Sequence, residues 1–188
     1  MQLEFRDVRQ CPAEYDRVES LYRRAFPEEE QMPTWLFRRR IRRDDVRLYS
    51  VWAAEWVGFV YLLVGEKTAY LMYFAVDDSC RGQGYGSQIL SELRALLPGR
   101  QILVSVEPLD PDAENCQQRE KRQSFYRRNG YVDSGYQVKE GEVTFDLLLS
   151  EINGFAPADY LALMKGFIGR LLGFVFHPAI FPSGEKVK

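Results

Sequence analysis

Hydrophobic and polar positions change their spacing several times along the chain, and each spacing predicts a different element. Residues 3–8 alternate between apolar and polar, which is typical of a partly exposed strand. After Pro12, apolar residues recur at helical spacing as far as Phe26, and a second short helix begins near Thr34. The start of the chain therefore predicts one strand followed by two helices.

The middle of the chain has the pattern of antiparallel strands. Two apolar runs, residues 47–54 and 56–64, meet at a tight turn around Ala54-Glu55, and a third run covers Ala69–Val76. All three are rich in β-branched and aromatic residues, which favour pleated, half-buried surfaces. We therefore expect a β-meander here.

The second half of the chain alternates between helix and strand patterns. A helix with one apolar face begins near Ser87, and the apolar run 102–106 predicts a strand buried on both faces. Residues 114–128 predict a highly charged helix, and residues 131–136 and 143–149 predict a closing hairpin. Strands followed by β-α-β-α-β-β predict an α/β fold with a mixed sheet and helices on both faces.

A glycine-rich turn joins the strand that ends at Val76 to the helix that follows it. Glycine occupies positions 82, 84 and 86 of this turn. Glycine lets the backbone approach a ligand closely, and the free N–H groups and dipole of a helix N-terminus attract an anion. The turn therefore predicts a phosphate or pyrophosphate site, with a tight turn that binds nothing as the alternative.

The turn fits one phosphate-binding motif better than two others. A Walker A loop needs lysine after the glycines, and a dinucleotide fingerprint needs Gly-x-Gly-x-x-Gly; this sequence has neither. Arg81-x-x-Gly84-x-Gly86 instead resembles the acetyl-CoA-binding signature of the GCN5-related N-acetyltransferases, the GNAT family. Residues 124–131, Ser-Phe-Tyr-Arg-Arg-Asn-Gly-Tyr, resemble a later motif of that family. The resemblance covers most of Leu3–Leu149.

The resemblance implies a fold, a domain boundary and a cofactor. The implied fold is a mixed, mostly antiparallel central sheet with splayed parallel central strands and helices on both faces. Residues 1–150 would form the acetyltransferase domain. Residues 151–188 would form an apolar C-terminal helical extension that packs on the core or on a second subunit. Acetyl-CoA would be the co-substrate, and no metal is expected.

The resemblance also assigns residues to the cofactor. Backbone groups of Phe74 and Val76 would pair with the pantetheine amide, and backbone N–H groups of the turn would hold the pyrophosphate. The residues assigned in the turn are Arg81, Gly82, Gln83, Gly84, Tyr85, Gly86 and Ser87. The Arg81 side chain could reach a phosphate or only cap the strand end. Arg119 and Arg122 replace the family's usual Asn and Ala. Arg119, Lys121 or Arg122 could meet the CoA 3′-phosphate, or this charged helix could face solvent.

A few side chains carry the implied reaction, which is direct attack of an amine on the thioester. Tyr126 matches the family's tyrosine and would donate a proton to the leaving thiolate, or it is an aromatic core residue. Glu107 ends a buried strand and would take the amine proton, bind a cationic substrate or cap a loop. The rival acids Glu28, Glu29 and Glu30 would attract an ammonium group, or they form a solvated turn.

Composition excludes several other function classes. The chain has 188 residues, 46% of them apolar, and a formal net charge of −2. We expect one globular domain without general attraction to nucleic acid or membrane. Three cysteines without metal-ligand spacing and a polar N-terminus without a signal peptide favour a reduced, cytoplasmic protein. The only histidine, His177, argues against a metal site or a histidine-based triad.

Together these observations predict an N-acetyltransferase that acts on a primary amine of a small molecule or on an exposed peptide or protein amine. The alternative is a catalytically silent acyl-CoA-binding or protein-interaction module with the same fold. The apolar tail favours packing on the core or a homodimer interface over a membrane surface.

Overall fold

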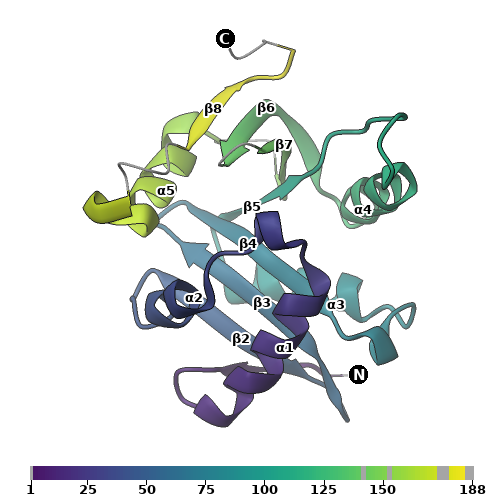
Figure 1. Ribbon diagram of the computed structural model, residues 1–188, viewed down its shortest axis with the longest axis vertical. Coiled ribbons are helices and arrows are strands. Elements are labelled where there is room, and N and C mark those ends of the chain that lie inside the picture. Colours follow the sequence, from purple (N-terminus) through teal and green to yellow (C-terminus); the bar gives the residue numbers. More distant parts are fainter. Residues whose placement is uncertain (1, 141–142, 152–153, 173–177, 185–188) are drawn as a thin grey trace. The chain divides into compact units, whose positions relative to one another are not determined.

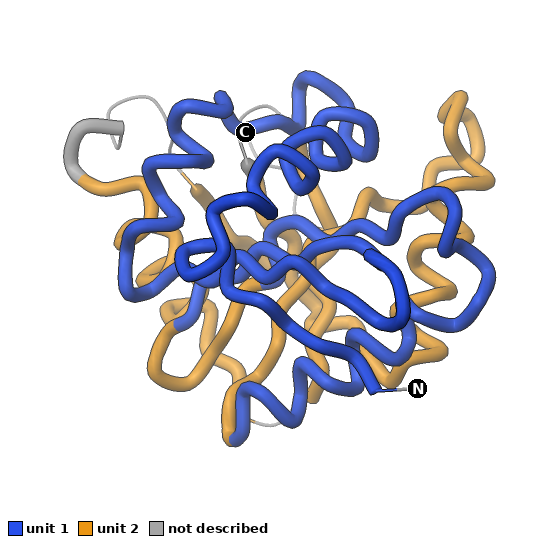
Figure 2. Tube along the Cα trace, turned by 90° about the horizontal axis from the view of Figure 1, so that it is seen from below, with its two compact units in different colours: residues 1–64, 71–98 blue, residues 65–70, 99–188 orange. Residues whose placement is uncertain are grey.

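A computed structural model describes residues 2–140, 143–151, 154–172 and 178–184 of the chain (Figure 1). The chain forms two compact units (Figure 2). Unit 1 comprises Met1–Val64 and Leu71–Pro98, and unit 2 comprises Gly65–Tyr70 and Gly99–Lys188. The strand β4 contributes to both units, because its residues 68–70 belong to unit 2 and the rest to unit 1.

Unit 1 is a β-meander with helices on both faces. Its strands are β1 (Glu4–Asp7), β2 (Val46–Trp52), β3 (Trp56–Val64) and the second part of β4 (Thr68–Val76). Its helices are α1 (Tyr15–Ala25), α2 (Thr34–Arg40) and α3 (Tyr85–Leu96), with short 3₁₀ turns at Pro12–Glu14, Glu28–Glu30 and Asp78–Cys80. Within this unit α1 and α2 cover one face of the strands and α3 covers the other (Figure 1).

Aromatic side chains form much of the core of unit 1. The ring of Tyr22 on α1 lies 4.6 Å from that of Phe37 on α2 and 4.8 Å from that of Tyr73 on β4. Phe37 lies 4.7 Å from Tyr61 on β3. Large rings in edge-on and tilted contact bury much apolar area, and each tyrosine hydroxyl still needs a polar partner. This requirement ties the core to the segment between α1 and α2.

Unit 2 is built around the strand β5. Besides the first residues of β4, it contains β5 (Gln101–Val106), α4 (Cys116–Arg128), β6 (Val132–Glu140), β7 (Val143–Leu149), α5 (Pro157–Leu172) and β8 (Ala179–Pro182). Thr68–Tyr70 of β4 pair in parallel with Gln101–Leu103 of β5. β5 pairs antiparallel with β7, and β6 and β7 form a hairpin. Beyond the paired residues β4 continues to Val76 and β5 to Val106.

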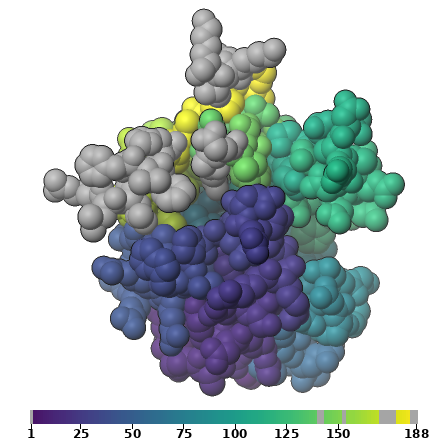
Figure 3. All heavy atoms as spheres, in the orientation of Figure 1, coloured from purple at the N-terminus to yellow at the C-terminus, as the bar shows by residue number. Residues whose placement is uncertain are grey.

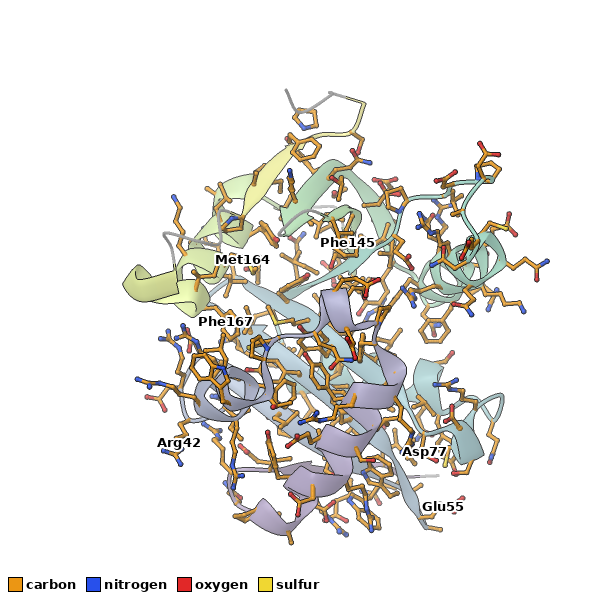
Figure 4. All side chains as sticks on the ribbon, in the orientation of Figure 1. Arg42, Glu55, Asp77, Phe145, Met164 and Phe167 are labelled. Carbon is orange, nitrogen blue, oxygen red and sulfur yellow. The ribbon has the colours of Figure 1, made fainter. Side chains whose placement is uncertain are left out.

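The C-terminal residues contribute to unit 2 in two ways. The buried residues of α5 include Tyr160, Met164 and Phe167. Phe145 of β7 is buried as well, and Figure 4 labels it together with Met164 and Phe167. Gly169 interrupts α5 with a φ of 67°. β8, which the sequence pattern did not predict, pairs antiparallel with β6. The apolar residues 173–177 lie outside the described residues, so the predicted role of this part of the tail stays a prediction.

The predicted fold class is confirmed. The strand order is β1-β2-β3-β4-β5-β7-β6-β8, mostly antiparallel, with one parallel pair among the described strands. Several boundaries differ from the prediction by a few residues. Helix α3 begins at Tyr85 and not near Ser87, and β6 extends to Glu140 and not only to Tyr136. Gly84 takes a left-handed conformation and serves as the N-cap, so the glycine turn runs directly into the helix.

Candidate functional site

Asp77 fixes the start of the turn that follows β4. Its Oδ1 accepts hydrogen bonds from the Ser79 backbone N–H at 3.1 Å and from the Ser79 hydroxyl at 2.7 Å. Its Oδ2 accepts from Arg24 Nη2 on α1 at 3.1 Å, and its own N–H donates to the Val57 carbonyl on β3 at 2.8 Å. Figure 4 labels Asp77. The hydrogen bonds from Ser79 are the main reason why the pKa of the Asp77 carboxyl is lowered. The turn is therefore anchored to α1 and β3 without any ligand.

Two glycines give the turn its shape. Gly82 and Gly84 have φ values of 76° and 85°, which side-chain-bearing residues rarely adopt. A Cβ atom at either position would meet nothing within 4 Å, so the space beside the backbone is open. Gly84 caps α3 without a side-chain hydrogen bond, and the first N–H groups of a helix have no acceptor within it. Because the Tyr85 side chain is buried, this residue can meet a ligand only through its backbone.

The side chains of the turn bond mainly to the turn itself. Arg81 Nε donates to the Val76 carbonyl at 3.2 Å, and Arg81 Nη1 lies 2.8 Å from Asp78 Oδ1 in an exposed ion pair. Gln83 Nε2 donates to the Ser79 carbonyl at 2.9 Å. Arg81 thus caps the strand end in this structure, which is one of the two roles expected of it. A contact between Arg81 and a phosphate stays a prediction.

At the end of β4 the side chains are alternately buried and half-buried, and the backbone of β3 comes very close. Tyr73 and Ala75 are buried, whereas Phe74 and Val76 are half-buried on the other face. Gly58 of β3 has a φ of 155°, and a Cβ atom there would lie 2.1 Å from the Ala75 carbonyl oxygen. Only glycine therefore fits at this position. Sequence analysis missed the role of Gly58, although a glycine inside an apolar strand is a known signal of close backbone approach.

The acidic run is hydrogen-bonded to the strand that leads into the glycine turn. Residues Glu28–Glu30 form a 3₁₀ turn in which Glu28 and Glu29 are exposed. The Tyr73 hydroxyl of β4 donates to the Glu30 carbonyl at 3.0 Å and accepts from the Met32 N–H at 3.3 Å. Two of the predicted regions, the acids and the strand before the turn, are thus connected through Tyr73 within unit 1.

Glu107 lies in unit 2, at the end of β5, with its side chain only 10% exposed. Its Oε1 accepts from Asn115 Nδ2 at 2.8 Å and lies 3.3 Å from Arg119 Nε. Its Oε2 accepts from Arg122 Nη1 at 2.7 Å. Arg119 and Arg122 were expected to meet a coenzyme phosphate or to face solvent, and here both contact Glu107. The role of Glu107 as a base stays a prediction.

Tyr126 lies on α4 and is 7% exposed. Its ring centroid is 5.2 Å from that of Phe125 and 5.5 Å from that of Tyr131. Burial raises the pKa of the Tyr126 hydroxyl to about 12, and the nearby charge of Arg122 opposes this shift. Within the described part of the chain the structure gives this hydroxyl no hydrogen-bond partner. A neutral phenol with a free hydroxyl can donate a proton or a hydrogen bond.

Sequence analysis missed two residues near Glu107, namely Asn115 and Gln123. Gln123 is 2% exposed, and its Nε2 donates to the Glu107 carbonyl at 3.1 Å and to Asp146 Oδ2 at 3.2 Å. Asn115, Arg119 and Gln123 are spaced at i, i+4 and i+8, which places them on one face of α4. This polar stripe was the signal in the sequence that could have identified the network.

The described residues lack two kinds of feature, a metal-binding cluster and a membrane-spanning helix. They contain no group of three or more histidine, cysteine, aspartate or glutamate side chains arranged to hold a metal ion. None of the helices in this part of the chain has the length and apolar character that crossing a membrane requires.

Comparison with known proteins identifies a related family and several related folds. Residues 47–133 match a family model described as an acetyltransferase (GNAT) domain. No curated protein sequence matches the chain at a significant level. The sequence-based resemblance is thus confirmed by the family model and by solved structures.

Three solved structures illustrate the similarity. A Bacteroides thetaiotaomicron protein described as a GNAT-family member is 24% identical, with a TM-score of 0.69 over 92% of this chain and 99% of that one. Arabidopsis thaliana NAA60, in complex with acetyl-CoA, is 16% identical, with a TM-score of 0.59 over 81% of this chain and 100% of that one. A mutant of Vibrio cholerae spermidine N-acetyltransferase SpeG is 15% identical, with a TM-score of 0.58 over 79% of this chain and 92% of that one. These similarities establish the fold.

Proposed function

We propose that the protein is an acetyl-CoA-dependent N-acetyltransferase, because residues 47–133 match a family model described as an acetyltransferase (GNAT) domain. It transfers the acetyl group to a primary amine of a small molecule, or to an exposed amine of a peptide or protein, by direct attack. The observation that carries this proposal is the open glycine turn, in which Gly82 and Gly84 hold left-handed conformations directly before the first N–H groups of α3.

In this proposal the turn binds the coenzyme mainly through its backbone. N–H groups from Gly82 to Ser87 hold the pyrophosphate, because the space beside Gly82 and Gly84 is open and the helix dipole adds positive potential there. Backbone groups of Phe74 and Val76, at the end of β4, pair with the pantetheine amide. The chain needs no lysine for this task, since oriented N–H groups supply the donors.

The chemical step needs a neutral amine, a donor to the oxyanion and an acid for the thiolate. The amine nitrogen attacks the thioester carbonyl carbon, and a backbone N–H near Val76 donates to the oxygen on which negative charge develops. The carbon–sulfur bond then breaks and the thiolate takes the proton of the Tyr126 hydroxyl. The N–H proton that the former amine loses as it becomes an amide returns to the Tyr126 phenolate and restores the neutral phenol. The Tyr126 hydroxyl is protonated at physiological pH, as a phenol ordinarily is, and burial raises its pKa further, to about 12.

Two sets of acids are candidates for accepting the proton of the ammonium group. Glu28 and Glu29 are exposed, and neither makes an ion pair with any described residue. They sit on a turn anchored to Tyr73, and their charge attracts a cationic acceptor. Glu107 is the other candidate, but it would have to release Arg122 or Asn115 before it could bind a proton.

A thiol-release assay tests the proposed function. The purified chain is incubated with acetyl-CoA and a panel of amines that includes spermidine, a lysine-containing peptide and a peptide with a free N-terminus. We expect free CoA to appear with at least one acceptor at a rate that depends on acceptor concentration. Thermal stabilisation by CoA without turnover on any amine would instead support the silent acyl-CoA-binding module.

A further inference from the structure

Five side chains of unit 2 form a polar network between the end of β5 and helix α4, which we call the α4 clamp. Its members are Glu107, Asn115, Arg119, Arg122 and Gln123. All five are buried or half-buried. The outer side of α4 and the loop before it lie at the molecular surface (Figure 3). The clamp therefore occupies the inner face of a helix whose other face meets solvent.

The clamp uses both oxygens of one carboxylate. Glu107 Oε2 holds Arg122 at 2.7 Å, and Oε1 holds Asn115 at 2.8 Å and Arg119 at 3.3 Å. Asn115 Oδ1 in turn accepts from Arg119 Nε at 2.7 Å, and Arg119 Nη1 donates to the Pro108 carbonyl at 3.1 Å. One carboxylate thus connects the residue before α4 with the first two turns of that helix.

Helix α4 buries few of its side chains. Gln123 and Tyr126 are its only buried residues, and Gln123 belongs to the clamp. Most other residues of the helix are polar or charged, so apolar packing contributes little along its length. The contacts of Gln123 with the Glu107 carbonyl and with Asp146 Oδ2 complete the attachment. The clamp therefore attaches α4 to the end of β5 and to β7 through side-chain hydrogen bonds.

Tyr126 follows Arg122 by four residues and lies on the same face of α4. Its ring packs against Phe125 and Tyr131, and no described residue bonds to its hydroxyl. The direction of that hydroxyl is consequently set by the position of the helix.

We infer that Glu107 is a positioning residue, which fixes Tyr126 by holding Arg122 and Arg119, and that these two arginines serve Glu107 and not the 3′-phosphate of the coenzyme. The inference rests on the proposed function for the role of Tyr126 in the reaction. The contacts themselves are independent of that role. As a positioning residue, Glu107 acts through Arg122 and Arg119, and this role replaces that of a base, for which Glu28 and Glu29 remain the candidates.

A double-mutant cycle with two coenzymes tests the inference. The variants are Glu107→Gln, Arg122→Gln, the double variant, Arg122→Lys, and Arg128→Gln as a control that removes an exposed arginine of the same helix. We measure kcat and KM with acetyl-CoA and with acetyl-dephospho-CoA, which lacks the 3′-phosphate.

We expect each single glutamine variant to lower kcat by about 10- to 100-fold, because a small misplacement of a reacting group costs rate of this order. KM should change little with either coenzyme, and the double variant should be no slower than the singles. Arg122→Lys should restore much of kcat, since it keeps the positive charge beside Glu107. Arg128→Gln should behave as the wild type.

Two results would overturn the inference. A large loss in Glu107→Gln with a normal Arg122→Gln would mark Glu107 as the base. A rise in KM of Arg122→Gln for acetyl-CoA, absent with the dephospho coenzyme, would mark Arg122 as a phosphate contact.

A spectroscopic readout separates this inference from the proposed function. The Tyr126 resonance of ¹³C-tyrosine-labelled protein is identified by its loss in Tyr126→Phe. We expect Glu107→Gln and Arg122→Gln to shift or broaden this resonance, and Arg128→Gln to leave it unchanged. If the resonance shifts in a protein that turns over no amine, the positioning role of Glu107 is supported and the proposed function is rejected. If the resonance is unchanged in Glu107→Gln and Arg122→Gln and the wild type is active, the positioning role of Glu107 is rejected.

Discussion

The glycine turn of unit 1 relies on backbone groups, whereas the α4 clamp of unit 2 relies on side chains. The turn is exposed, and its proposed donors are backbone N–H groups beside open space. The clamp is made of side chains that surround one buried carboxylate. Side-chain identity therefore matters in the turn mainly where glycine alone can adopt the conformation. In the clamp, substitution of a single charged side chain should already lower kcat.

Substitution of Gly84 should give the largest effect. Gly84→Asp places a carboxylate and a strained backbone where the pyrophosphate is proposed to sit, because φ is 85° there. We expect CoA affinity to fall by about 100-fold, or about 2.7 kcal/mol, in isothermal titration calorimetry.

Gly99→Asp is the matched control for Gly84→Asp. Gly99 has a φ of 72° and open space around a Cβ atom, as Gly84 has. Both variants should lose about 1–2 kcal/mol of stability through the left-handed backbone. Only Gly84→Asp should lose CoA binding, and equal binding by the two variants would remove the turn from the proposed site.

Tyr126→Phe should come next, with an effect on turnover and not on binding. Loss of the proton donor should lower kcat by about 100-fold, the usual scale of general acid catalysis. KM for acetyl-CoA should stay close to the wild-type value, because the ring and its packing remain. A Tyr126→Phe protein with wild-type kcat would exclude the phenol as the acid.

The pH dependence of the wild type should reflect the raised pKa of Tyr126. The proton is present below the pKa of about 12, so kcat at saturating substrates should show no loss from phenol ionisation up to about pH 10. Burial disfavours the phenolate in the folded state. The contribution of this group to stability is therefore full below its unfolded pKa of about 10 and is lost as pH rises through about 12. A basic limb near pH 10 that disappears in Tyr126→Phe would contradict this prediction.

The smallest effect should come from Asp77, which supports the turn without facing a ligand. Asp77→Ala removes the cap on Ser79 and the contact with Arg24. We expect a loss of about 1 kcal/mol in the free energy of unfolding, as for other caps. CoA affinity should fall only slightly, which calorimetry would measure against Asp78→Ala, an exposed neighbour. A loss as large as that of Gly84→Asp would mean that the side chain itself binds the coenzyme.

The sequence predicted the features of this molecule that depend on local patterns. Strands β1 to β7 and helices α1, α2 and α3 follow from the spacing of apolar residues. The charged helix α4 and the helical tail follow from other local signals, and the glycine turn follows from residues that tolerate positive φ. These signals are short-range, so they can be read without knowing what each segment packs against.

Long-range contacts explain what was not predicted. The four residues of β8 form a strand because β6 offers them a partner some forty positions earlier in the chain. Glu107 was identified as a functional candidate, but its partners depend on which face of α4 turns toward β5. Gly58 was passed over because its need for glycine comes from Ala75 on a neighbouring strand.

The pairing of β8 with residues Tyr136–Lys139 of β6 has a practical consequence for shortened forms of the protein. Removal of residues 179–188 would leave a row of backbone donors and acceptors on β6 without their strand partner. Such a bare rim recruits other chains, so the shortened protein should aggregate even where the glycine turn and the α4 clamp are intact.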